Sequence, residues 1–411
     1  MTMHHCRHCG QTLEHSFCDL GMSPLSNAYL TQEQLVKMEP FFPLHAQVCA
    51  SCHLVQLPAV ETPENIFSDY AYFSSYSDSW LDHCRRYVDG MISRFGFDKQ
   101  SQIVEIASND GYLLQYFRER EVPVLGIEPA GNVAKVAQAA GIETVVRFFG
   151  EQTATDLRAS GRGADLLLGN NVLAHVPNIN DFVRGMQALL KPEGIITMEF
   201  PHLLRLMREN QFDTIYHEHF SYLSLMTVER IFGRHGLRLF DVEQLPTHGG
   251  SLRIYATHAG NTAQTESTRL LGLRQEERDA GLDRMETYSS FADQVRRTKR
   301  ALLAFLIAAK NEGKSIVGYG APAKGNTLLN YCGVRSDFID YTVDRSPHKQ
   351  GRFLPGTHIP IAAPERIAET RPDYLLILPW NLKEEIMSQM AHVRSWGCRF
   401  VVPIPELRII E

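Results

Sequence analysis

The sequence predicts an α/β protein built around a mostly parallel, doubly wound sheet. Between residues 75 and 260, short apolar runs alternate with amphipathic segments, which is the pattern of strand–helix units. The alternation returns in residues 313–411, whereas residues 1–70 are rich in Cys, His and Pro. We therefore expect a doubly wound domain between a metal-binding N-terminal domain and a second, C-terminal α/β domain.

The central domain is expected to contain a sheet that closes with an antiparallel pair, because its last two apolar runs are joined by a short link. Helical patterns cover Gly131–Ala140 and Asn180–Leu190. The expected strands are Ile103–Ala107, Val122–Ile127, Thr144–Arg147, Asp165–Gly169, Gly194–Phe200, Leu237–Val242 and Leu252–Thr257.

The domain boundaries follow from these changes in pattern along the 411 residues. We place a zinc-binding domain at 1–72, the doubly wound domain at 73–265 and a C-terminal domain at 313–411. The charged segment 266–312 is compatible with helix and is expected to connect the last two domains.

Charge and hydropathy indicate which partners and which compartment to expect for the protein. The net charge of −6 disfavours nucleic acid as a partner. The longest apolar run, Ala301–Ala309, is about half the ~20 residues that cross a bilayer, so no membrane association is expected. The N-terminus lacks the apolar core of a signal peptide, and we predict a cytoplasmic protein.

Two Cys-x2-Cys pairs in the first 52 residues predict a metal site. Each pair presents two thiolates, and two pairs complete the tetrahedral sulfur shell that zinc favours. A full shell leaves no position for substrate, so the zinc should be structural. The predicted ligands are Cys6, Cys9, Cys49 and Cys52.

A turn with small residues follows the first expected strand, within Glu105–Gly111. Such a turn lets a ligand approach the backbone, and an acidic residue after the next strand, Glu128, has the spacing of a ribose-binding carboxylate. Both dinucleotide redox chemistry and methyl transfer from S-adenosylmethionine fit. The closing antiparallel pair and the missing glycines of a pyrophosphate-binding turn favour methyl transfer.

A cluster of His, Glu and Tyr follows the fifth expected strand, at Tyr216–Tyr222. These are side chains of proton transfer, and His175, after the fourth strand, could reach the same edge of the sheet. His217 and His219 could alternatively bind metal, although the helical His-Glu-x-x-His spacing is absent. The later run from His248 to Arg253 is expected to be a hairpin that either lines the site or simply turns.

The C-terminal domain carries a second glycine-containing turn, Gly318–Gly320, after an expected strand. Lys324 follows closely, so a contact with a diphosphate group is predicted at this turn, with a purely structural turn as the alternative.

Together these motifs resemble the sugar C-3′-methyltransferases, which act on nucleotide-linked 4-keto-6-deoxyhexoses. The resemblance spans essentially the whole chain, and Ala107 departs from it, since related methyltransferases commonly carry Gly there. The motifs are the four cysteines, Tyr72–Tyr76, Glu105–Gly111, Asn171–Pro177, Glu199–His202, Tyr216–His219, His248–Arg253 and Gly318–Thr327.

The resemblance implies a zinc-binding domain, an S-adenosylmethionine-dependent methyltransferase domain of Rossmann-like fold, and a C-terminal Rossmann-like domain without that cofactor. The nucleotide sugar would lie between the last two. It implies His219 as the general base, with catalytic partners Tyr216, Glu218, Tyr76 and His175. Cofactor contacts are expected from Glu105, Ala107, Asn109, Gly111, Glu128, Pro129 and Asn170. Substrate contacts are expected from Asn171, His202, His248, Ser251, Arg253 and Lys324.

The implied reaction explains these residue types. A ketone at sugar carbon 4 makes the hydrogen on carbon 3 acidic, so that a His base can form an enolate that accepts the methyl group. The nucleotide is expected to be thymidine diphosphate, with guanosine or cytidine diphosphate as alternatives. An O- or N-methyltransferase, or a zinc-bearing binding protein with a relict cofactor fold, are the competing interpretations.

Overall fold

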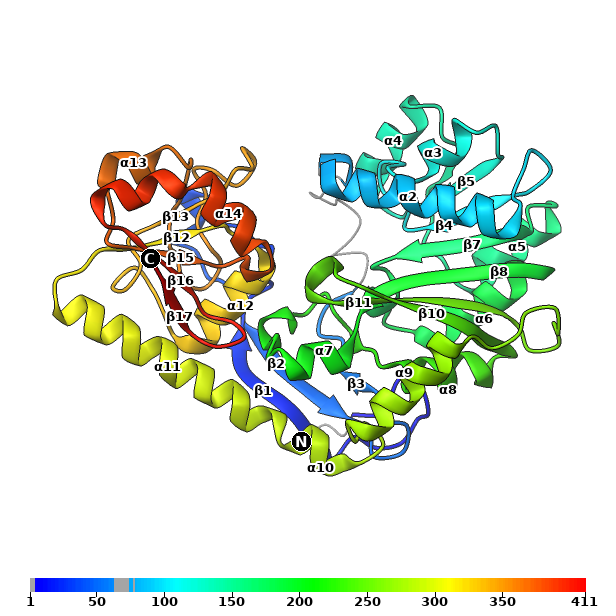
Figure 1. Cartoon of the computed structure of the whole chain (residues 1–411), viewed down its shortest axis with the longest axis horizontal. Helices are drawn as coiled ribbons and strands as arrows, with labels where there is room; N and C mark the ends of the chain where they lie inside the picture. The colour runs from blue at the N-terminus through cyan, green and yellow to red at the C-terminus, as the bar shows by residue number, and fades with distance from the viewer. Residues whose placement is uncertain (1–3, 63–73, 77) are drawn as a thin grey trace.

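The computed structural model describes residues 4–62, 74–76 and 78–411, which form three β-sheets (Figure 1). The central sheet has seven strands in the order β10-β11-β8-β7-β4-β5-β6. Its strands are β4 (Ile103–Ile106), β5 (Val124–Ile127), β6 (Thr144–Val145), β7 (Ala164–Asn170), β8 (Leu190–Pro201), β10 (Leu237–Leu245) and β11 (Ser251–His258). All pairs from β8 to β6 are parallel, and β11 is antiparallel to both of its neighbours. The predicted doubly wound sheet with a late antiparallel element is confirmed.

Apolar side chains point to both faces of the central sheet, because helices cover both. Leu166 and Leu168 of β7 face one layer, whereas Leu167 faces the other. The first layer contains α2 (Asp78–Phe95), α3 (Leu114–Arg118) and α4 (Gly131–Ala139). The second contains α5 (Glu151–Ala159), α6 (Ile179–Leu189), α8 (Leu225–Arg234) and α9 (Thr268–Asp279). The short α7 (Leu203–Arg208) follows β8.

The C-terminal sheet has six strands in the order β14-β13-β12-β15-β16-β17, and only β17 runs antiparallel to its neighbour. Its strands are β12 (Ile316–Tyr319), β13 (Thr342–Val343), β14 (Ile361–Ala362), β15 (Tyr374–Ile377), β16 (Arg399–Val402) and β17 (Arg408–Ile410). Its helices are α12 (Ala323–Cys332), α13 (Arg366–Thr370) and α14 (Lys383–Gln389).

The N-terminal segment supplies three strands of a four-stranded antiparallel sheet, and the fourth strand, β9, comes from the central region. Its strands are β1 (His15–Ser23), β2 (Phe42–Val48), β3 (Val55–Gln56) and β9 (Ser221–Tyr222). Buried residues of β1 and β2 share one apolar core with the C-terminal sheet, whereas Cys6, Cys49 and Cys52 share a core with the central sheet. The N-terminal segment therefore packs against both larger sheets.

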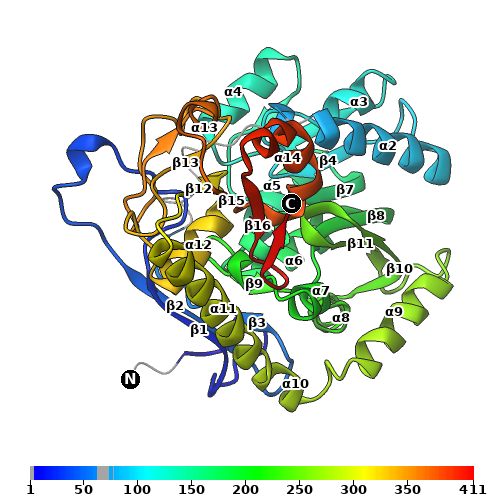
Figure 2. The ribbon, with the colours of Figure 1, turned by 60° about the vertical axis from the view of Figure 1, so that its left-hand side comes forward.

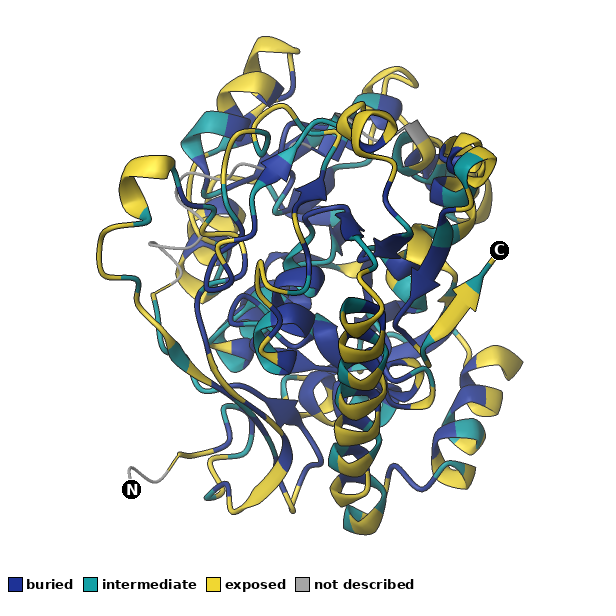
Figure 3. Ribbon diagram, turned by 90° about the vertical axis from the view of Figure 1, so that its left-hand side faces the viewer, coloured by how far each residue is buried: buried dark blue, intermediate teal, exposed yellow. Residues whose placement is uncertain are grey.

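Helices occupy most of the predicted helical segment 266–312. After α9 come α10 (Met285–Ser289) and α11 (Phe291–Asn311), which runs alongside β1 (Figure 2). Phe17 of β1 stacks on Phe291 with ring centroids 4.7 Å apart. The outer face of α11 is exposed, and the inner strands of the two larger sheets are buried, whereas the edge strand β17 is largely exposed (Figure 3). Among the described helices, none has the length and apolarity needed to span a bilayer.

We expect Glu277 of α9 to stabilise the fold strongly. Its buried carboxylate accepts hydrogen bonds from the backbone N–H groups of Leu225 and Met226 and lies 2.8 Å from His202 Nε2. Glu277→Ala leaves these buried groups without a partner and should lower the free energy of unfolding by about 3 kcal/mol in urea denaturation. The neighbouring Glu276→Ala removes a half-exposed ion pair with Arg208 and should change it by less than about 1 kcal/mol. Equal effects of the two variants would contradict this interpretation.

Candidate active site and metal site

The predicted cofactor residues lie where β4, β5 and β7 end, at one edge of the central sheet. Glu105 is within β4, Glu128 and Pro129 directly follow β5, and Asn170 is the last residue of β7. Because these strands are parallel neighbours, their carboxyl ends meet at this edge.

The turn after β4 has the backbone conformation of a tight ligand-binding turn. Ala107, Asn109 and Gly111 have φ angles of 56°, 50° and 81°, in the left-handed region. Ala107 therefore adopts a conformation that glycine would reach at lower cost, which accounts for the glycine common at this position. A Cβ on Gly111 would lie 2.4 Å from Cδ1 of Ile142, so only glycine fits there without a shift.

The same turn holds the segment that contains Tyr76. Asn109 Oδ1 accepts the backbone N–H of Ser74 at 3.0 Å, and Asp110 Oδ2 accepts that of Ser75 at 3.2 Å. These bonds place the backbone of Ser74–Tyr76 beside the predicted cofactor site. The side chain of Tyr76, like Tyr72 and Phe73, lies outside the part of the chain that the structure describes.

Two buried carboxylates, those of Glu105 and Glu128, lie at this edge of the sheet. Neither oxygen of Glu105, which is completely buried, has a hydrogen-bond partner among the described residues, and burial raises its pKa well above the usual value. Glu128 Oε2 accepts the N–H of Asn109 at 2.9 Å, and Oε1 accepts that of Ala130 at 2.8 Å. A ligand that brings a cationic group to Glu105 fits this arrangement, as the ammonium group of S-adenosylmethionine would.

His219 is held by backbone contacts on both sides. Its Nδ1 lies 2.8 Å from the carbonyl oxygen of Thr214, which can only accept, so Nδ1 carries the hydrogen and Nε2 has a free lone pair. The N–H of the next residue, Phe220, donates to the carbonyl of Ala174 at 2.8 Å, while Leu57 N–H donates to the carbonyl of Phe220. These bonds tie the His219 loop to the His175 loop and to the N-terminal sheet.

Three of the predicted catalytic rings form one cluster. The His219 ring lies 3.9 Å from that of Tyr216 and 4.7 Å from that of His175, between ring centroids. Burial, followed by the neighbouring His175, holds the pKa of His219 well below its usual value. Burial lowers the pKa of His175 to about 4. Both imidazoles are therefore neutral near pH 7.

Glu218 and His217 point toward the N-terminal segment. Glu218 Oε1 accepts a hydrogen bond from Asn27 at 2.7 Å, and burial raises the pKa of Glu218. His217 Nε2 lies 3.2 Å from the carbonyl oxygen of Pro43. The two histidines of this loop thus have different partners, and within the described residues the only convergent group of metal-ligating side chains is the cysteine quartet.

Of the predicted substrate residues, Asn171 and His248 lie together at the end of β7. Asn171 Nδ2 is 3.4 Å from His248 Nε2, and the rings of His248 and Trp80 of α2 make a T-shaped contact with centroids 5.4 Å apart. The polar turn before β11 therefore lines this edge.

Arg253 instead binds carboxylates of the central sheet. Its guanidinium donates to Glu199 at 3.0 Å and to Glu243 at 2.9 Å. Glu199, which is completely buried, also bonds His83 and Thr247, and these partners outweigh its burial and lower its pKa to about 2. Glu199 thereby joins α2 to the turn that carries His248.

Hydrogen bonds within the protein occupy two of the predicted substrate residues, His202 and Ser251. His202 Nε2 lies 2.8 Å from Glu277, with both side chains buried. Ser251 Oγ donates to the carbonyl of Thr247 at 3.0 Å and is buried.

Lys324, from α12 of the C-terminal domain, faces the central sheet. Its Nζ donates to Asn381 Oδ1 at 2.8 Å and lies 4.5 Å from the centroid of Trp380. Burial is the main cause that lowers the pKa of His219 and of His248, and the positive charge of Lys324 contributes to both shifts. The glycines before it have packing reasons, since a Cβ on Gly318 would lie 2.7 Å from Thr342 Oγ1.

Sequence patterns did not single out the buried polar residues around the cluster of His219, Tyr216 and His175. Asp213 accepts the indole N–H of Trp380 at 2.8 Å, across 167 residues of sequence, and Asn27 reaches Glu218 across 191. No local periodicity reports such contacts. Glu199 was visible only as part of the Glu199–His202 motif.

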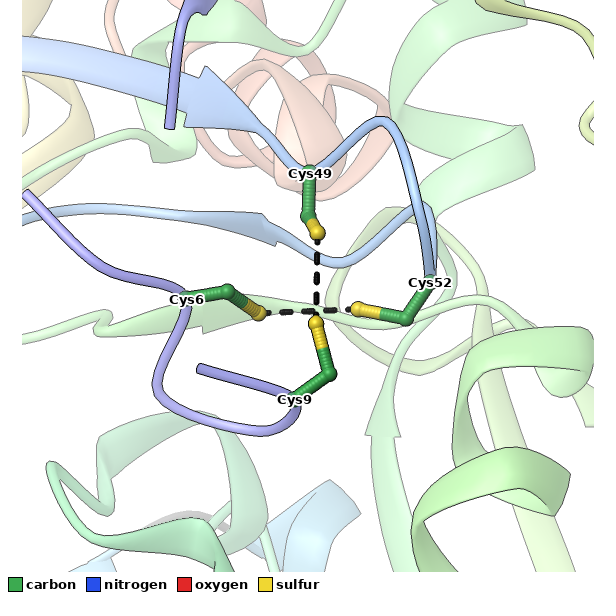
Figure 4. Close-up of side chains that lie close together, drawn as sticks. All are labelled: Cys6, Cys9, Cys49 and Cys52. Carbon is green, nitrogen blue, oxygen red and sulfur yellow. Dashed lines mark hydrogen bonds between the residues drawn. The ribbon is translucent and has the colours of Figure 1, made fainter. Parts of the chain in front are cut away.

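The four predicted metal ligands converge at the N-terminus (Figure 4). All four sulfur atoms lie within 4.8 Å of one another, and the Cys6–Cys52 and Cys9–Cys49 distances are 3.5 Å. Zinc–sulfur bonds of about 2.3 Å in a tetrahedron put sulfurs roughly 3.8 Å apart, so the quartet fits zinc. Four protein ligands complete the shell, as expected of a structural zinc.

Three family profiles together cover most of the chain. A zinc binding domain matches residues 6–67, a methyltransferase domain matches 80–242, and a C-methyltransferase C-terminal domain matches 246–405. A solved S-adenosylmethionine dependent methyltransferase from Mesorhizobium loti is 14% identical, with a TM-score of 0.35, covering 43% of this chain and 99% of that one.

Loss of one zinc ligand should unfold the N-terminal region. We expect the protein to bind about one zinc ion per chain, and Cys49→Ser to lose it together with thermal stability, because binding energy of a structural zinc is folding energy. The control is Cys84→Ser, which alters a completely buried cysteine remote from the quartet and should retain the metal. Metal analysis by mass spectrometry and thermal unfolding would measure both, and full zinc content in Cys49→Ser would contradict the assignment.

Comparison with curated proteins identifies the family. C-methyltransferase NovU of Streptomyces niveus is 37% identical over 406 residues, which are 99% of this chain and 96% of that protein. A ubiquinone biosynthesis O-methyltransferase of Azorhizobium caulinodans is 28% identical over 116 residues, covering 26% of this chain and 46% of its own length. With the zinc quartet, the methyltransferase sheet and the matching C-terminal domain, the chain belongs to the family of S-adenosylmethionine-dependent C-methyltransferases.

Proposed function

We propose that this enzyme methylates carbon 3 of a nucleotide-linked 4-keto-6-deoxyhexose. The observation that carries the proposal is the His219 imidazole, whose Nδ1–H is fixed on the Thr214 carbonyl. Its free Nε2 lies among His175 and Tyr216 at the ligand-binding edge of the sheet, where a general base for carbon acid chemistry would be needed.

His219 Nε2 would remove the proton from carbon 3, and the electrons of the C–H bond would move onto the oxygen at carbon 4. Tyr216, in ring contact with His219, would donate a hydrogen bond to that enolate oxygen, and His175, also in ring contact, would help to position the base. Glu218, held by Asn27, would fix the loop between them.

S-adenosylmethionine supplies the methyl group when it is bound. Glu105, with its unpartnered buried carboxylate, would hold the ammonium group of that ligand, and Glu128 would hold its ribose hydroxyls. Ala107, Asn109 and Gly111 would let it approach the backbone, while Pro129 and Asn170 would line the same edge. Binding both reactants here holds them in line for transfer.

The sugar nucleotide would bind between this edge and α12. Lys324 would meet the diphosphate, and Asn171 and His248 would contact the sugar. Arg253, His202 and Ser251 would act through their neighbours, because hydrogen bonds within the protein occupy them. We propose thymidine diphosphate as the nucleotide, with guanosine and cytidine diphosphate as alternatives.

Replacing the base should abolish proton exchange and methylation together. His219→Ala should lower both rates by about a hundred- to ten-thousand-fold. The matched control is His258→Ala, since His258 also lies near a backbone carbonyl, that of Leu190, but at the opposite edge of the same sheet. The measurement is mass spectrometry of 4-keto-6-deoxysugar nucleotides incubated with S-adenosylmethionine in deuterated buffer.

The other outcomes separate the competing functions. Methylation without prior exchange of a carbon-bound hydrogen, unaffected by His219→Ala, would identify an O- or N-methyltransferase. Neither exchange nor methylation across the nucleotide panel would favour a binding protein.

The pH dependence of exchange should reveal the lowered pKa of His219. A base acts in its neutral form, so exchange should persist at pH 6.5 and fall only as the pH drops through the lowered pKa. Lys324→Gln removes a positive charge that contributes to this lowering and should move the acid limb to higher pH at saturating substrate. Lys314→Gln, which disrupts an ion pair with Asp373, should leave it unmoved. An acid limb above pH 6.5 in the unmodified enzyme would contradict the role of His219.

A further inference from the structure

Trp380 contacts three segments that surround the proposed sugar-nucleotide site. Its indole N–H donates to Asp213 Oδ2 at 2.8 Å, and Lys324 Nζ lies over its ring at 4.5 Å. A Cβ on Gly249, next to His248, would lie 2.8 Å from Cη2 of Trp380, so the turn before β11 packs directly on the indole. Trp380 is only 6% exposed.

Asp213 is an unusual anchor because it is completely buried. The indole N–H satisfies Oδ2, while Oδ1 has no hydrogen-bond partner among the described residues. Burial raises the pKa of Asp213 to about 7, and the positive charge of Lys324 opposes that rise. A buried carboxylate of this kind costs stability, so packing alone does not explain it.

Asp213 also directly precedes Thr214, whose carbonyl fixes the tautomer of His219. The bond to Trp380 therefore links the loop that orients the base to the C-terminal domain that carries Lys324. Asn381, which follows Trp380, accepts a hydrogen bond from Lys324 at 2.8 Å. The ammonium group is thus held by two consecutive residues, and both depend on where Trp380 lies.

We propose that Asp213 and Trp380 are positioning residues of the sugar-nucleotide site: Asp213 fixes the indole, and the indole holds the Lys324 ammonium where the substrate's diphosphate binds. This inference rests on the proposed function, since it requires a nucleoside diphosphate as ligand. A cation held over an aromatic ring is pre-organised, so less side-chain freedom is lost when an anion binds.

The test is calorimetric titration of the full-length zinc-loaded protein with thymidine, guanosine and cytidine diphosphates. Trp380→Phe should weaken binding of the preferred diphosphate about tenfold, because the N–H anchor is lost. Lys324→Gln should have a similar effect, and the double variant should add little to either, as expected for residues that act as one unit. Asp213→Asn, whose amide oxygen can still accept the indole N–H, should lose less affinity than Trp380→Phe.

The matched control is Trp396→Phe, which removes another indole N–H bond of the same domain, to the carbonyl of Pro372 at 3.1 Å. Unchanged diphosphate affinity in Trp380→Phe, with a loss of thermal stability like that of Trp396→Phe, would overturn the inference and leave a purely structural contact. Additive losses in the double variant would also overturn it. If the unmodified protein binds none of the diphosphates, the proposed function itself fails.

Discussion

The pairing of β3 with β9 is the constraint on which the candidate site depends. Through it, the N-terminal segment that carries the four cysteines is hydrogen-bonded to the loop that carries His219. The same segment supplies Asn27 to Glu218 and Tyr29 to the Ala321 carbonyl of the C-terminal domain. A short loop without regular structure would otherwise sample many conformations, and backbone pairing on one side with the Ala174 bond on the other selects one. The cysteine quartet thus acts on the candidate site through the geometry of the N-terminal segment.

The electrostatics of the site follow from burial more than from ion pairs. Burial is the largest cause of the low pKa of both His219 and His175, and it keeps both imidazoles neutral. A neutral imidazole whose Nδ1–H is held by a carbonyl is ready to accept a proton at Nε2. Charged side chains near the site also pair with one another: Arg253 bonds Glu199, and the charge of Lys324 opposes the raised pKa of Asp213. These groups connect α2, the turn that carries His248 and the C-terminal domain.

Sequence pattern predicted the central sheet closely, because its strands are buried on both faces and read as continuous apolar runs. The seven expected strands are all present, although β8 begins at Leu190 rather than Gly194 and β6 ends at Val145. The cysteine pairs were equally readable, since both ligands of each pair are local. What pattern could not show is pairing between distant segments. Nothing around Ser221 indicates that it pairs with Gln56, and nothing around His202 indicates that it lies beside Glu277.

The contact between residues 23–31 and the C-terminal domain has a consequence for how such enzymes can be recombined. Asn326 donates to the Ser26 carbonyl at 2.6 Å, and Leu30 pairs with Phe353. A chimera that exchanges only the C-terminal third between two relatives would therefore bring together two halves of an interface that changed separately. We expect a chimera to keep the substrate preference of the donor enzyme only when residues 23–31 are exchanged together with the C-terminal domain. The interface thus joins residues that lie 300 positions apart in the sequence.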